Sequence, residues 1–72
     1  MSGRQESIRR HRAAIAALRQ ELEPYQSQQQ RAMEPRGGVW VDVTDERVEF
    51  LERTIAELER VMAIEERKDR EE

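Results

Sequence analysis

The chain has 72 residues, of which 40% are charged and 36% hydrophobic, and its formal net charge is −3. So little apolar material favours one small domain that needs a second copy of itself or another partner to be stable. No cysteine is present, which excludes disulfides, thiolate zinc sites and thiol nucleophiles. No apolar run approaches the roughly 18 residues of a transmembrane helix, and no apolar stretch typical of a signal peptide opens the chain. We therefore expect a cytoplasmic protein with no membrane contact.

The first third of the chain has the repeat of an amphipathic helix. Its larger side chains recur at the a and d spacing of a heptad, at Ile8, His11, Ile15, Leu18, Leu22 and Tyr25. The pattern predicts a helix over about residues 5–33. Pro24 lies inside that range, where it removes one backbone hydrogen bond and crowds the preceding turn. We expect either a kink or a break at this residue.

A connector of a different character follows, over about residues 34–43. Pro35 ends the first helix, because the residue before a proline is disfavoured in the helical region. Gly37 and Gly38 indicate a turn, and the valines that alternate with Trp40 and Asp42 indicate a short extended segment. Trp40 keeps two interpretations: it covers the tip of the core, or it is an exposed anchor for a partner.

The second helical pattern covers about residues 45–70, with Thr44 as the expected N-cap and acidic residues in the first turn. Its main apolar stripe is Val48, Leu51, Ile55, Leu58 and Met62. Two matched amphipathic helices with a short connection pack as an antiparallel hairpin. The predicted fold class is therefore all-α, a coiled-coil-like two-helix hairpin that forms a single domain over residues 1–72.

The second helix also carries a strip of apolar residues that a monomeric hairpin does not need. Phe50, Val61 and Ile64 lie about 120° around the helix from the main stripe. A helix with two apolar strips is normally buried between two neighbours, although three scattered exposed residues are the alternative. Together with the small core, the strip predicts a homo-oligomer, most simply a dimeric four-helix bundle. A different protein partner would satisfy the same physics.

Charge is unevenly spread, because residues 1–23 sum to +2 and residues 42–72 sum to −6. The basic cluster is Arg4, Arg9, Arg10 and Arg12. In an antiparallel hairpin it lies beside the acidic end of the second helix, which would fix the antiparallel pairing. The same arginines could instead bind nucleic-acid phosphates or an acidic protein. The acidic overall balance and the lack of an aromatic residue in the cluster disfavour nucleic acid.

No constellation of residues indicates catalysis. His11 is the only histidine, which excludes a two-histidine metal site within one chain. We expect it to be half-buried near the open end of the hairpin, where Glu65 or Glu66 could give it a pH-sensitive contact. The carboxylates of the second helix lie beside arginines on solvated faces and not in a cleft. We expect no enzyme activity, no catalytic residues, no cofactor and no metal.

The leading functional expectation is a non-catalytic protein–protein interaction module, a small adaptor, inhibitor or regulator that works as an oligomer. Its partner-binding candidates are Trp40, Phe50, Val61 and Ile64, and its partners are a second copy of the chain and one other protein. The alternative is a small helical-hairpin regulator that binds RNA or DNA through the Arg4–Arg12 face. A third possibility is a structural protein whose only role is assembly.

Overall fold

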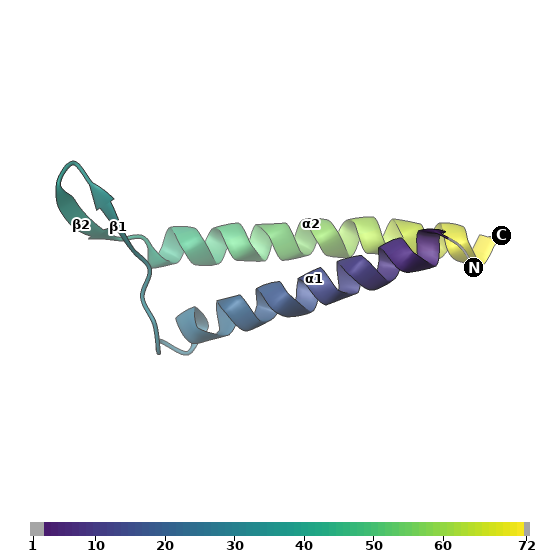
Figure 1. Cartoon of the computed structure of the whole chain (residues 1–72), viewed down its shortest axis with the longest axis horizontal. Helices are drawn as coiled ribbons and strands as arrows, with labels where there is room; N and C mark the ends of the chain where they lie inside the picture. Colours follow the sequence, from purple (N-terminus) through teal and green to yellow (C-terminus); the bar gives the residue numbers. More distant parts are fainter. Residues whose placement is uncertain (1–2, 72) are drawn as a thin grey trace.

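The computed structural model of the protein, described here for residues 3–71, contains two long helices joined by a small β-hairpin (Figure 1). The elements in chain order are α1 (Gly3–Gln26), β1 (Met33–Arg36), β2 (Val39–Asp42) and α2 (Thr44–Glu71). The two helices lie side by side in opposite directions, so the start of α1 and the end of α2 share one end of the molecule. We call this the open end, and the end that carries the β-hairpin the closed end.

Helix α1 is shorter than the sequence pattern predicts, because it ends at Gln26 instead of continuing to about residue 33. Pro24 lies within its last turn, so the helix passes through the proline and stops two residues later. Gln28 then adopts a left-handed backbone conformation, with φ of 63°. The carbonyl of Pro24 accepts hydrogen bonds from the amides of Gln29 and Gln30, at 2.9 and 3.1 Å. These bonds satisfy a carbonyl that the end of the helix leaves without a partner.

The segment expected as an irregular connector forms an antiparallel β-hairpin. Gly37 and Gly38 have φ of 58° and 82°, the positive values that a two-residue hairpin turn of type I′ requires. This turn pairs Arg36 with Val39 and Met33 with Asp42. The all-α prediction was therefore incomplete: the fold is mostly helical, with a two-stranded sheet between the helices.

The core lies along the seam between the two helices. Leu51, only 2% exposed, packs with Ile15, Leu22 and Ile55. Around this cluster are partly buried side chains that the heptads placed on the same stripes: Leu18, Tyr25, Val48, Leu58 and Met62. Within residues 3–71 of the single chain, the structure shows a helix pair but neither a coiled coil nor a dimeric bundle.

A buried threonine joins the β-hairpin to the start of α2. The hydroxyl of Thr44 accepts a hydrogen bond from the Ala32 amide at 3.0 Å and donates one to the Asp42 carboxylate. Asp42 also accepts a bond from the Thr44 amide at 2.9 Å, so Asp42 caps α2 and Thr44 does not. Hydrogen bonds from the Thr44 hydroxyl and amide, with a smaller contribution from the charge of Arg31, lower the pKa of Asp42 from its ordinary value of 3.8.

The molecule is elongated, with principal extents of 54 × 24 × 16 Å and a radius of gyration of 16.4 Å. A compact chain of this length would have a radius of gyration of about 11 Å. Its accessible surface is 5795 Å², whereas a compact monomer of its 8.6 kDa mass exposes about 4,700 Å². The chain therefore exposes about 1,100 Å² more than a self-contained domain of the same size.

Candidate interaction surfaces

The first candidate surface is one side of the helix pair. Arg19 and Glu59 form an ion pair along one edge of the seam, and Gln26 donates a hydrogen bond to Glu52 farther along. Leu18 precedes Arg19 by one residue and Val61 follows Glu59 by two, so helical geometry places both on the opposite edge. The same spacing adds three more residues to that side. We call the resulting set the apolar flank: Leu18, Tyr25, Phe50, Val61 and Ile64.

Two residues of the apolar flank are highly exposed for large apolar side chains. Phe50 is 57% exposed and Ile64 is 45% exposed, while Val61 is half-buried. Thr54 lies between them on the same side of α2, and its hydroxyl is satisfied by the Phe50 carbonyl at 2.8 Å. The charged residue Glu57 also lies on this side of α2, between Phe50 and Ile64, and it forms an ion pair with Arg60. Three of the four predicted partner-binding residues thus lie along one side of α2.

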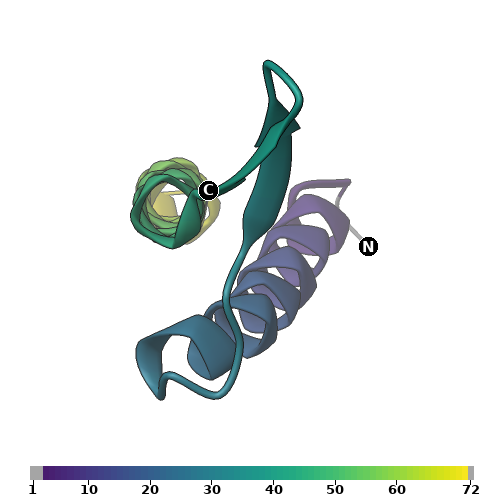
Figure 2. The same cartoon turned by 90° about the vertical axis from the view of Figure 1, so that its left-hand side faces the viewer.

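The fourth, Trp40, lies on a separate surface. It is 67% exposed on β2, and Val39 and Met33 beside it on the hairpin are also largely exposed. Figure 2 looks along the helices from the closed end and shows the tip of the hairpin reaching beyond both of them. Trp40 therefore does not cover the tip of the helical core.

An ion pair joins the hairpin to the start of α2. The Arg36 guanidinium donates hydrogen bonds to Glu46, on the first turn of α2, at 2.9 Å and to Glu34 at 3.1 Å. Both carboxylates raise the pKa of Arg36 above its ordinary value, the hydrogen bond to Glu46 contributing most. Arg31, two residues before β1, lies 3.5 Å from the carboxylate of Asp42 at the end of β2.

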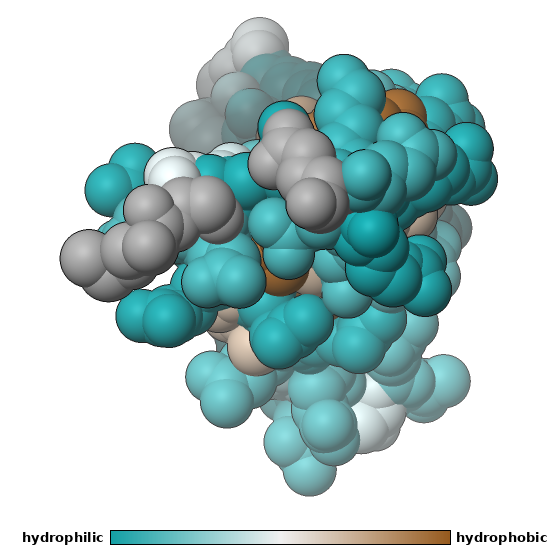
Figure 3. Space-filling view, turned by 90° about the vertical axis from the view of Figure 1, so that its right-hand side faces the viewer, coloured by the Kyte–Doolittle hydropathy of each residue, from teal (hydrophilic) through white to brown (hydrophobic). Residues whose placement is uncertain are grey.

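Most of the coloured surface seen from the open end is hydrophilic (Figure 3). Arg12 lies 3.6 Å from Glu66, and His11 Nδ1 lies 3.2 Å from Glu65 Oε1. The expected pairing of the basic cluster with the acidic end of the second helix is therefore present at Arg12, and His11 makes a neighbouring contact across the same seam. Arg10 instead pairs with Glu6, one turn away on the same helix.

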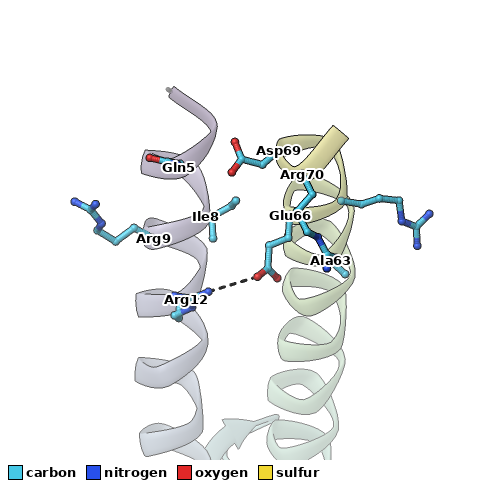
Figure 4. A pocket seen from close by; sticks show the side chains of 9 residues that line it. Gln5, Ile8, Arg9, Arg12, Ala63, Glu66, Asp69 and Arg70 are labelled. Carbon is cyan, nitrogen blue, oxygen red and sulfur yellow. Dashed lines mark ion pairs between the residues drawn. The ribbon is translucent and has the colours of Figure 1, made fainter. Parts of the chain in front are cut away.

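An open groove of about 580 Å³ runs between the helices at this end. It is lined by Gln5, Ile8, Arg9, Arg12, Ala63, Glu66, Arg67, Asp69 and Arg70. In Figure 4 the Arg9 side chain borders the groove with its guanidinium directed outward, whereas Arg12 reaches across to Glu66. Successive helical positions are 100° apart, so Arg10 points away from the side of α1 that carries Arg4, Arg9 and Arg12.

Residues 3–71 contain no group of three or more side chains with the character of metal ligands. Over the same range, neither helix is long and apolar enough to cross a membrane. The carboxylates lie on open helix surfaces, where neighbouring arginines pair with several of them, as Arg53 does with Glu49 at 3.0 Å.

Sequence reasoning missed β1 and, with it, the exposed Met33 beside Trp40. A usable signal was present, because two glycines between two short runs are typical of a two-residue hairpin. Scans against protein-family models, curated proteins and solved structures found no match to this chain.

Proposed function

We propose that the protein is a non-catalytic protein–protein interaction module that works as a homodimer of helical hairpins. The two copies join through the apolar flank, and the dimer presents the Trp40 hairpin to another protein. The observation that carries this proposal is the excess exposed surface of the single chain.

A standard protein interface buries about 800 Å² on each partner. The chain exposes about 1,100 Å² more than a compact monomer of its mass, so covering one such interface would return it to the ordinary range. The apolar flank is the part of the helix pair where Phe50 and Ile64 stand exposed. A second copy brings an identical flank, which meets the requirement of a two-fold interface that one patch bind itself.

Light scattering of the purified chain at micromolar concentration tests the proposal. The parent should have at least twice the mass of one chain, and Phe50→Glu or Ile64→Glu should reduce it to one, because an unpaired carboxylate in an apolar interface is costly. Ala13→Glu is the matched control, since Ala13 is exposed and lies on the outer side of α1. A parent of monomer mass with a sharp thermal transition would contradict the proposal.

Nucleic-acid binding through the Arg4–Arg12 face stays the second candidate. Arg9, Arg67 and Arg70 line the open-end groove, and no acidic partner is recorded for them within residues 3–71. Two of the four arginines, Arg10 and Arg12, already form ion pairs with glutamates of the same chain, which favours the protein-binding proposal. Salt-dependent binding of random RNA or DNA that Arg9→Glu with Arg67→Glu abolishes would reverse this order.

A further inference from the structure

We propose that the outer edge of β2 is a strand-pairing site for β2 of a second copy, so that two β-hairpins join into one four-stranded sheet. The inference rests on the proposed function in treating the chain as self-assembling. It uses a different surface from the apolar flank, so the two can fail independently.

The hydrogen-bond pattern of the hairpin identifies which backbone groups face outward. The Val43 amide donates to the Ala32 carbonyl at 2.8 Å, so these two residues form a hydrogen-bonded pair. Such pairs alternate along an antiparallel ladder. In the observed register, the pairs of Trp40 with Pro35 and of Asp42 with Met33 are therefore the ones whose amides and carbonyls point away from the ladder.

On β2, these outward groups are the amide and carbonyl of Trp40 and of Asp42. No backbone partner for them is recorded within the described part of the chain. Both residues are exposed, so the edge is open to solvent and to another strand. A row of unpaired strand amides and carbonyls is a template for strand addition.

The edge of β1 is interrupted by a proline. Pro35 is an outward position of β1, and it has no amide hydrogen to donate. Proline at such a position is a common device that prevents pairing along a sheet edge. The hairpin therefore has one competent edge, and that edge belongs to β2.

The hairpin itself needs further support. An isolated two-stranded sheet is marginally stable in water, and three or more strands or a covering helix are needed for independent stability. Here each strand has four residues, and only Val41 among them is even half-buried. Figures 1 and 2 show the hairpin extending beyond the ends of the helices, so little of it is covered by them.

The sequence of β2 makes a second copy the suitable occupant. Antiparallel pairing about a two-fold axis at Val41 sets Trp40 opposite Asp42 of the second copy, and all four outward groups of each strand then find partners. Val41 faces Val41 of the second copy, a favourable pair of β-branched side chains. No two like charges stand directly opposite each other.

The pairing is tested by measuring amide hydrogen exchange of the parent chain with NMR, at micromolar and at millimolar concentration. The amides of Trp40 and Asp42 should exchange several-fold more slowly at the higher concentration, because pairing protects them. The Met33 amide faces outward on the β1 edge, and its exchange should not change. Trp40 and Asp42 amides that stay as fast as Met33 would overturn the proposal.

Two substitutions at one position separate the backbone from the side chain. Trp40→Pro removes the outward amide and leaves the ladder inside the hairpin intact, as Pro35 does on β1. The Phe50→Glu substitution prevents dimerisation through the apolar flank, so a chain that carries it should dimerise only at millimolar concentration, through strand pairing. Adding Trp40→Pro should abolish this dimer. Trp40→Ala keeps the amide and should retain concentration-dependent protection at Asp42.

The outcomes distinguish the two surfaces. If Phe50→Glu reduces the dimer to a monomer at micromolar concentration, and Trp40→Pro changes neither the mass of the assembly nor amide exchange, the flank proposal stands and strand pairing is overturned. Equal loss in Trp40→Ala and Trp40→Pro, with no protection of Asp42, would show that the indole docks without strand addition and would also overturn it. Protection of Trp40 and Asp42 that survives Phe50→Glu would support strand pairing alone.

Discussion

The hydroxyl of Thr44 donates a hydrogen bond to the carboxylate of Asp42, two residues before it, while accepting one from the Ala32 amide. The pair fixes three parts of the chain at one point: the residue before β1, the end of β2 and the first turn of α2. Because Thr44 is only 5% exposed, its polar atoms have little access to water that could replace these bonds.

Replacing this hydroxyl should destabilise the protein. Thr44→Val keeps the shape of the side chain but leaves the buried Ala32 amide without an acceptor, which costs about 1–3 kcal/mol. Urea unfolding at neutral pH measures the loss. Thr54→Val is the matched control, because the Thr54 hydroxyl bonds only to a carbonyl of its own helix, and it should cost much less. Equal losses in the two variants would contradict the role assigned to Thr44.

The lowered pKa of Asp42 predicts a pH dependence with a definite sign. A carboxyl whose folded pKa lies below its unfolded value stabilises the fold above the unfolded pKa, and this contribution disappears as the pH falls through the folded pKa. For Asp42 the contribution should therefore be complete above pH 3.8 and be lost progressively below it. Other carboxylates titrate in the same range, so the measured quantity is the difference in unfolding free energy between the parent and Asp42→Asn. That difference should shrink below pH 3.8, and a constant difference would count against the assignment.

The open end offers a charge-swap test. Arg12→Glu should lower the unfolding free energy by about 0.2–1 kcal/mol, since an exposed ion pair contributes no more than this, and the loss should shrink at high salt. Adding Glu66→Arg should restore most of the stability by re-forming the pair in reverse. Arg10→Glu combined with Glu66→Arg should show no such rescue, because Arg10 pairs with Glu6 on its own helix. Thermal melts of the single and double variants at two salt concentrations give the coupling.

At Gly37, in the turn of the β-hairpin, backbone conformation alone should decide which substitutions are tolerated. No atom lies within 4 Å of a Cβ added at Gly37, so space does not limit substitution there. With φ of 58°, Gly37→Asn should be tolerated, because asparagine accepts the left-handed region and Asn-Gly favours this turn. Gly37→Val should cost about 1–2 kcal/mol of hairpin stability. NMR contacts between Pro35 and Trp40 across the strands report whether the hairpin forms.

Much of the helix pairing could be predicted from the sequence, because it depends on side-chain periodicity that the structure preserves. The heptads identified the seam that holds Ile15, Leu22, Leu51 and Ile55, and the antiparallel direction brought His11 to Glu65. The end of α1 could not be found this way. Gln29 and Ala32 continue the heptad in the sequence. In the structure, however, Gln28 has a left-handed backbone conformation and the Ala32 amide donates a hydrogen bond to the Thr44 hydroxyl.

The sheet and the surfaces were harder to predict for different reasons. Met33–Arg36 has no alternating pattern of apolar residues and contains a proline, so its own β-propensity is low. It forms a strand because the turn brings it beside β2. The exposure of Phe50 and Ile64 follows from their angle around one helix and was visible in the sequence. The exposure of Trp40 depends on where the hairpin extends in space, which no local pattern encodes.

Pro35 has a consequence for how far assembly can extend. The strand Val39–Asp42 carries two exposed apolar side chains, Val39 and Trp40, beside an unpaired edge, and such edges promote edge-to-edge aggregation in other proteins. Each hairpin has one edge that can add a strand and one that lacks an amide at its centre. Pairing of two β2 edges uses up both competent edges and leaves a proline at each border of the new sheet. The sheet then cannot grow beyond four strands, so the hairpin can pair with a second copy without starting a fibril.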